Sequence, residues 1–357
     1  MCDRRLLRAA SPCSWGLTLP EAVGLREVAV GVREGTGLSE ALCLRGASRA
    51  LREVVSATGF RETSSPHLFV CGGESNGQFL SSVECLDPAT GGWQTLPVGL
   101  RRGRHWAAAA ALRGAVYVCG GSDGRQVLSS VEALEVATLA WRDMPPMLER
   151  REGAAVAVAG GRLLVVGGGD GRSILRSAER FSPGAPGEWD ALEPMGHCRL
   201  GSAACHAGGH VYVCGGNGGE TSLSSAETLS LATGAWEELP AMEQQRERFA
   251  ASCVGGFLYV CGGCDHRQGP LASVERLDLQ ALRWESLSSM PRDRRHGAAA
   301  ATLAGQILVC GGSYGRHDLR LVECFDAPSN RHLVRVPADA GAEEQRGRRV
   351  AARLAAA

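Results

Sequence analysis

The sequence predicts an all-β fold: a six-bladed β-propeller of four-stranded antiparallel blades, preceded by a short helical segment. Three observations predict it. A short apolar strand that stops at two glycines, as in HVYVCGG at residues 210–216, occurs six times. The glycine pairs begin at intervals of 47 to 49 residues, a regularity typical of repeat proteins. A glutamate and a tryptophan follow most pairs at nearly constant distances, which indicates that a whole supersecondary unit is repeated.

Each repeat contains four predicted strands in the same order. An arginine and a run of small residues, such as that at 105–114, come first, and the strand that ends at the glycine pair follows. After a polar loop come a strand containing SVE or SAE and a last strand with the tryptophan. In a radial array small side chains fit the strand nearest the axis, and a large tryptophan fills the wider gap between outer strands. The glycines allow a sharp turn and close backbone approach.

The ends of the repeat region predict how the ring closes. The first repeat, which begins near residue 66, has no arginine and small-residue strand before it. The tail at 348–356 has Arg348 and Ala351 in the places that Arg104 and Ala107 occupy in the second repeat. We therefore expect residues 66–357 to form the propeller, with the tail as the inner strand of the first blade. Such closure removes exposed sheet edges.

Composition excludes several classes of partner. The 38 basic and 38 acidic residues cancel, and every basic residue is arginine, so net charge favours neither nucleic acid nor an anionic membrane. No run approaches the roughly 18 apolar residues of a membrane span, and the N-terminus lacks the apolar core of a secretory signal. We expect a protein of the cytoplasm or the nucleus. Five of the 14 cysteines directly precede a glycine pair, which predicts reduced thiols in the core.

The succession of arginine, YVCGG strand, SVE strand and tryptophan resembles the kelch repeat over residues 66–357. The resemblance implies a β-propeller that binds other proteins. No cofactor is expected. The cysteines of CGGC at 261–264 do not predict a metal site, because the first of them belongs to the repeat. Neighbours such as Cys205 and His206 point to opposite faces of a strand.

The loops after the glycine pairs and the loops that lead into the first strands are expected at one end of the ring. Their arginines are suited to bidentate pairing, so the predicted partner is a protein with an acidic or phosphorylated segment. Because the rim arginines recur in every repeat, a role inside the blade is the alternative for them. The expected loop contacts are Asn76, Arg125, Arg172, Asn217, His266, Arg267, Tyr314 and Arg316, and the rim arginines are Arg104, Arg151, Arg199, Arg246 and Arg295.

Residues 1–60 lie outside the repeats and have a helical pattern. Apolar residues recur there at steps of three and four, which predicts one apolar helix face. Together with Leu19 and Pro20, this segment resembles an F-box, which implies docking to the Skp adaptor of a cullin–RING ubiquitin ligase. An amphipathic cap on the propeller is the alternative. The expected docking residues are Leu44, Ala47, Leu51, Val54 and Val55.

Three functions therefore compete. The first is a protein-interaction module that receives substrates for a cullin–RING ligase. The second is a kelch scaffold, or a binder of actin and the cytoskeleton, with no link to a ligase. The third is a small-molecule enzyme in the propeller channel, such as a sugar mutarotase. No nucleophile–base pair or phosphate-binding glycine motif can be assembled from the sequence, so we expect a binding protein and not an enzyme.

Overall fold

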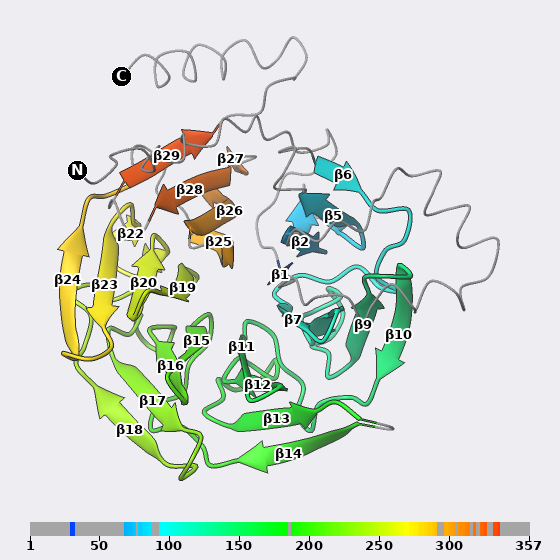
Figure 1. Cartoon of the computed structure of the whole chain (residues 1–357), viewed down its shortest axis with the longest axis horizontal. Coiled ribbons are helices and arrows are strands. Elements are labelled where there is room, and N and C mark those ends of the chain that lie inside the picture. The colour runs from blue at the N-terminus through cyan, green and yellow to red at the C-terminus, as the bar shows by residue number, and fades with distance from the viewer. Residues whose placement is uncertain are drawn as a thin grey trace, which may run out of the picture.

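The computed structural model describes residues 29–32, 68–75, 78–86, 93–184, 187–290, 296–303, 306–314, 317–318, 322–326 and 331–335. Every regular element in these ranges is a β-strand. The sheets stand around a central axis, with one strand of each near the centre and another at the periphery (Figure 1).

Five sheets have four strands each. Neighbouring strands are antiparallel and follow one another in chain order from the inner to the outer edge, apart from the short hairpins named below. The first sheet contains β1 (Ala29–Val32), β2 (Leu68–Cys71), β5 (Val83–Leu86) and β6 (Trp93–Thr95). The second contains β7 (Ala108–Leu112), β8 (Ala115–Cys119), β9 (Val131–Glu135) and β10 (Ala140–Met144). The third contains β11 (Ala155–Ala159), β12 (Arg162–Val166), β13 (Ala178–Ser182) and β14 (Glu188–Leu192).

The fourth sheet contains β15 (Ala203–Ala207), β16 (His210–Cys214), β17 (Ala226–Ser230) and β18 (Trp236–Leu239). The fifth contains β19 (Ala250–Val254), β20 (Phe257–Cys261), β23 (Val274–Asp278) and β24 (Arg283–Leu287). The last repeat forms β25 (His296–Leu303), β26 (Gln306–Tyr314), β27 (His317–Asp318), β28 (Val322–Asp326) and β29 (Arg331–Arg335). Small separate hairpins are β3 (Glu74–Ser75) with β4 (Gln78–Phe79) and β21 (Cys264–Asp265) with β22 (Gly269–Pro270).

The prediction of six four-stranded blades with a helical N-terminal segment is wrong. Only five of the described sheets are four-stranded blades, because the sheet of the last repeat has five strands. There β26 continues through Gly311 and Gly312, so its hairpin with β27 is joined to the sheet and does not stand apart as β3–β4 does. No helix occurs among the described residues, and 29–32, inside the segment expected to be helical, form a strand.

The closing strand also differs from the expected one. β1 pairs antiparallel with β2, with Val30 opposite Val70, and so occupies the inner position expected for residues 348–356. The tail itself lies outside the described residues. β1 contacts both β7 and β25, so the inner strands form a closed ring.

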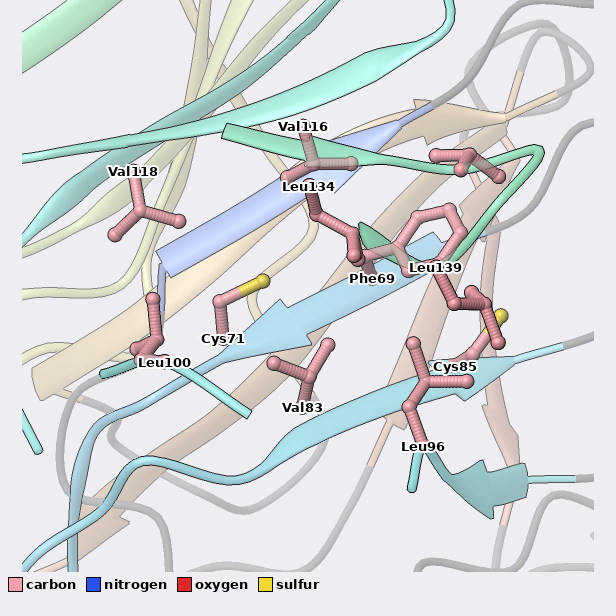
Figure 2. Packing of buried hydrophobic residues seen from close by; sticks show 11 residues of the cluster. Phe69, Cys71, Val83, Cys85, Leu96, Leu100, Val116, Val118, Leu134 and Leu139 are labelled. Atoms are coloured by element: carbon pink, nitrogen blue, oxygen red, sulfur yellow. The ribbon is translucent and has the colours of Figure 1, made fainter. Parts of the chain in front are cut away.

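The hydrophobic core lies between neighbouring sheets. In the cluster shown in Figure 2, Phe69 and Val83 of the first sheet pack with Val116 and Leu134 of the second, and all four are fully buried. Three outer tryptophans, Trp189, Trp236 and Trp284, donate a hydrogen bond to the preceding repeat. Trp189 donates its indole N–H to the Pro145 carbonyl at 2.9 Å. Tryptophan therefore fills the gap between outer strands, as the repeat pattern predicts.

The glycine pairs are required by contacts between successive repeats. Gly120 has φ of +64°, and a Cβ atom there would overlap the carbonyl oxygen of Arg151 in the next repeat. Gly121 donates its N–H to that same oxygen at 2.8 Å. No other residue provides both the left-handed backbone and the space.

Candidate functional site: the loop face

The leading loops, which precede the inner strands, and the glycine loops, which follow the glycine pairs, lie at one end of the ring. Isolated β-bridges join the two kinds of loop in four successive repeats. We call this end of the ring the loop face. The bridges are His105 with Ser122, Glu152 with Gly169, Leu200 with Asn217, and Glu247 with Cys264.

Four rim arginines are buried inside their blades. Each has a side chain no more than 1% exposed and forms an ion pair with the glutamate of the SVE or SAE strand of its own repeat. Both members of each pair are buried, so removing one leaves an uncompensated charge in the interior, at a cost of about 3–5 kcal/mol. The pairs are Arg104 with Glu132, Arg151 with Glu179 at 2.6 Å, Arg199 with Glu227 at 2.7 Å, and Arg246 with Glu275.

The same arginines connect successive repeats. The Arg151 guanidinium donates through Nη1 to the carbonyl of Gly167 in its own repeat at 2.7 Å. Its backbone carbonyl accepts from Gly121 of the preceding repeat. The second carboxylate oxygen of Glu179 accepts the N–H of Leu148 at 2.7 Å, which fixes the leading loop. These four arginines are therefore structural, and the alternative stated for them in the sequence analysis is the one that the contacts support. Arg295 lies outside the described residues.

Glu84 is the exception among the repeat glutamates whose side chains the structure describes. It is 2% exposed, and neither carboxylate oxygen has a hydrogen-bond partner. The first repeat has no arginine 28 residues earlier, because Ser56 stands at that place. Burial alone raises the pKa of Glu84 to about 7.

The glycine loops carry the exposed arginines. In the second repeat the Asp123 carboxylate accepts the backbone N–H groups of Arg125 at 2.9 Å and Gln126 at 3.0 Å. These bonds lower the pKa of Asp123 and hold the loop in a tight turn. Asp170 and Asp265 form the same turns in the third and fifth repeats. The side chains presented to solvent at the equivalent turn position are Arg125, Arg172 and Arg267.

Other predicted loop residues have different places. His266 is exposed beside Arg267, and its backbone N–H donates to Ser222 Oγ of the preceding glycine loop at 3.1 Å. Asn217 is half-buried, and its Oδ1 accepts the N–H of Gly219 within the same loop at 2.7 Å. Its loop presents exposed Glu220 where other repeats have arginine.

Some predicted site residues lie outside the described residues. They are the loop residues Asn76 and Arg316 and the docking residues Leu44, Ala47, Leu51, Val54 and Val55. Tyr314 ends β26, and only its backbone is described.

Two residues at the centre of the loop face were missed by the sequence analysis. Trp106 and Arg248 have positive φ angles of 54° and 53°, although neither is glycine. Gly153 and Gly201 occupy the same position in the two intervening repeats. Because these glycines have no side chains, the Arg248 guanidinium reaches the Trp106 ring and stacks 4.4 Å from its centroid, a cation–π contact. The sequence did contain a signal for these two residues. Both stand two residues after a rim arginine, at the position where the intervening repeats have glycine.

The cysteines correct one expectation. Cys71, Cys119 and Cys214 before the glycine pairs are free and buried, and burial raises the pKa of each to about 12, as expected for inert core thiols. Cys205 and Cys253, however, form a disulfide between β15 and β19, with Cα atoms 6.0 Å apart. Sequence reasoning missed this pair because the residues occupy different positions in their repeats.

Within the part of the chain that the structure describes, no helix is long and apolar enough to cross a membrane. Over the same residues, no group of three or more His, Cys, Asp or Glu side chains is arranged to hold a metal ion.

The described sheets form a β-propeller with exposed arginines on its loop face, and this fold generally supports a protein-interaction module. The chain belongs to the kelch-repeat family: it matches the Kelch motif at residues 63–97, 103–148, 150–196, 198–243, 245–291 and 294–331. Among solved structures it is similar to that of the protein YjhT, with a TM-score of 0.64 and 15% sequence identity over 75% of this chain and 94% of that one. At this identity the likeness concerns the fold. No curated protein matches the chain in sequence.

Proposed function

We propose that the chain is a substrate receptor of a cullin–RING ubiquitin ligase, and that the loop face holds the substrate. The observation that carries the binding role is the set of three exposed arginines held at one turn position by Asp123, Asp170 and Asp265. Fixed turns lower the entropy cost of ordering the arginines on binding. A protein segment with acidic or phosphorylated side chains is the complementary partner.

The ligase role is supported by Leu19, Pro20 and the apolar pattern of residues 44–55, which together resemble an F-box and flank β1 in the sequence. In this proposal the segment docks a Skp adaptor, and the propeller holds the substrate near the ubiquitin-loaded enzyme at high effective concentration. Such a receptor acts in the cytoplasm or the nucleus. A binding role also fits the centre of the loop face, where Trp106 and Arg248 are stacked on each other.

The test is affinity purification of the full chain from a cell extract, followed by mass spectrometry. One variant carries Leu44→Asp, Leu51→Asp and Val55→Asp, and a second carries Arg125→Glu, Arg172→Glu and Arg267→Glu. We expect the first variant to lose a Skp-like protein and a cullin, and the second to lose the substrate only. The control for charge reversal at a surface arginine is Arg162→Glu, compared with each single loop substitution, because Arg162 is exposed at the start of β12, away from the glycine loops.

If the intact chain retains proteins but no Skp or cullin, the ligase role is wrong and the chain is a kelch scaffold. If the loop-arginine variant retains every protein that the intact chain binds, the assignment of the loop face is wrong.

A further inference from the structure

A cavity of about 380 Å³ opens on the loop face of the second repeat, between its leading loop and its glycine loop. Its polar lining includes Arg101, Arg102, Arg104, Ser130 and Arg150. These residues are not among those expected to bind a partner, apart from the buried Arg104. The only carboxylates in its lining are those of Glu132 and Asp143.

Positive charge in this cavity is only partly compensated. Four arginines face two carboxylates, which leaves a formal charge of 4 − 2 = +2. Arg101 pairs with Asp143 at 2.6 Å, and Arg104 pairs with Glu132. Arg102 is 3.9 Å from Asp123 outside the lining, and Arg150 is exposed and makes no ion pair with the described residues.

Comparison among the repeats shows which group is missing from the cavity. In the third repeat Ser177 Oγ donates to Glu149 Oε2 at 2.7 Å, and that carboxylate also pairs with Arg151 at 3.3 Å. In the fifth repeat Ser273 Oγ donates to Gln244. The equivalent serine of the second repeat, Ser130, is exposed and donates to no described residue, because Arg102 replaces the acceptor.

The buried arginine of this repeat is also incompletely bonded. Arg104 is 1% exposed and lines the cavity, and its Nε has no hydrogen-bond partner. Nε of Arg151 donates to Glu179 at 2.6 Å in the third repeat, whereas Nε of Arg246 in the fifth repeat has no partner, like that of Arg104. The corresponding cavity of the fifth repeat, about 230 Å³, has no charged residue in its lining. The second repeat thus has a cavity that combines net positive charge with an unused serine donor.

We propose that this cavity binds a phosphoryl group, supplied by a phosphorylated side chain of the partner protein. A phosphoryl group carries nearly two negative charges and three acceptor oxygens, which match the formal charge of +2 and the donors of Ser130, Arg102 and Arg150. Its oxygens occupy the place that the Glu149 carboxylate occupies in the third repeat. The source of the group rests on the proposed function, but binding of the group itself does not.

The test is isothermal titration calorimetry on the full chain, first with inorganic phosphate and then with a Gly-Gly-phosphoserine-Gly-Gly peptide in chloride buffer. The key variant is Arg102→Glu, which rebuilds the arrangement of the third repeat and fills the cavity with the chain's own carboxylate. We expect it to keep the melting temperature and to weaken phosphopeptide binding at least tenfold. Arg102→Gln, the residue type found at Gln244, is a second variant with the same expected direction and no new charge.

Arg162→Glu makes the same charge change away from the cavity and is expected to bind as the native chain does. Equal weakening by Arg162→Glu and Arg102→Glu would show nonspecific attraction and overturn the proposal, as would undiminished binding by both Arg102 variants. A peptide with aspartate in place of phosphoserine that binds equally well would overturn the phosphoryl assignment. If the native chain captures protein partners but does not bind phosphate or the phosphopeptide, only this inference is refuted. If it binds phosphate but captures no protein partner, only the proposed function is refuted.

Discussion

Single arginines on the loop face differ in burial, and burial separates their roles. Arg199 is fully buried against Glu227, whereas Arg172 is exposed on a glycine loop. Replacing Arg199 with methionine leaves the Glu227 charge without its partner, so we expect a loss of about 3–5 kcal/mol in the free energy of unfolding. Arg172→Met should change it by less than about 0.5 kcal/mol. Urea denaturation measures both, and equal effects would contradict the distinction.

Glu84 gives a prediction about pH. Its pKa rises from an ordinary value of 4.5 to about 7 in the folded state, so folding holds its proton more tightly. The contribution of the protonated Glu84 side chain to the free energy of unfolding is therefore full below pH 4.5 and is lost as the pH rises through 7. Glu84→Gln should therefore raise the free energy of unfolding at pH 8, relative to the native chain, by about 3 kcal/mol.

The same comparison at pH 4 should show little difference between Glu84→Gln and the native chain. The matched variant Glu132→Gln should be destabilised at pH 8, because Arg104 then loses its buried partner. If Glu84→Gln follows the native pH dependence, the carboxylate is paired in solution.

Sequence reasoning at this scale identified the repeated residues but not their contacts. It left two roles open for Arg104, Arg151, Arg199 and Arg246, contact with a partner at the rim or support inside the blade, because position in a repeat does not reveal burial. The spacing between the rim arginine and the glutamate of the SVE or SAE strand could have indicated this burial. The glutamate follows the arginine by 28 or 29 residues in each of these repeats, which is consistent with an ion pair inside one blade.

At the scale of the element, the glycine pairs can be tested directly. Gly120→Ala places a Cβ atom against the Arg151 carbonyl and also forces alanine into a left-handed conformation. Gly160 has a similar φ of +57° in the turn between β11 and β12, but its neighbourhood is open. Both variants share the backbone strain of about 1 kcal/mol, so we expect Gly120→Ala to be the less stable by a further ~1–3 kcal/mol.

Thermal unfolding of the two alanine variants, side by side, measures this difference. Equal melting temperatures would mean that conformation alone selects glycine and that close contact between repeats contributes nothing.

The strands were predictable because each repeat supplied the same pattern five or six times. The extra strand β27 was not, because it depends on whether β26 stops at its glycine pair or continues through it. The sequence analysis also did not predict the stacking of Arg248 on Trp106, since this contact joins repeats that are not neighbours in the chain.

At the scale of the whole molecule, closure of the ring depends on β1. Its pairing with β2 and its contacts with β7 and β25 connect the first and last repeats. Deleting residues 1–34 should expose the edge of β2 and lower the melting temperature by several degrees, because edge groups lose their hydrogen bonds. Deleting residues 348–357 should have a smaller effect. The reverse order would show that the tail closes the ring.

The central claim is that the glycine loops of the loop face hold the protein partner. Hydrogen–deuterium exchange on the full chain, with and without a captured partner, tests it most directly. We predict added protection at residues 122–127, 169–174 and 264–270, and none at the turns of the opposite end, 112–115, 159–162 and 254–257. Protection confined to the opposite turns or to the outer strands would contradict the account.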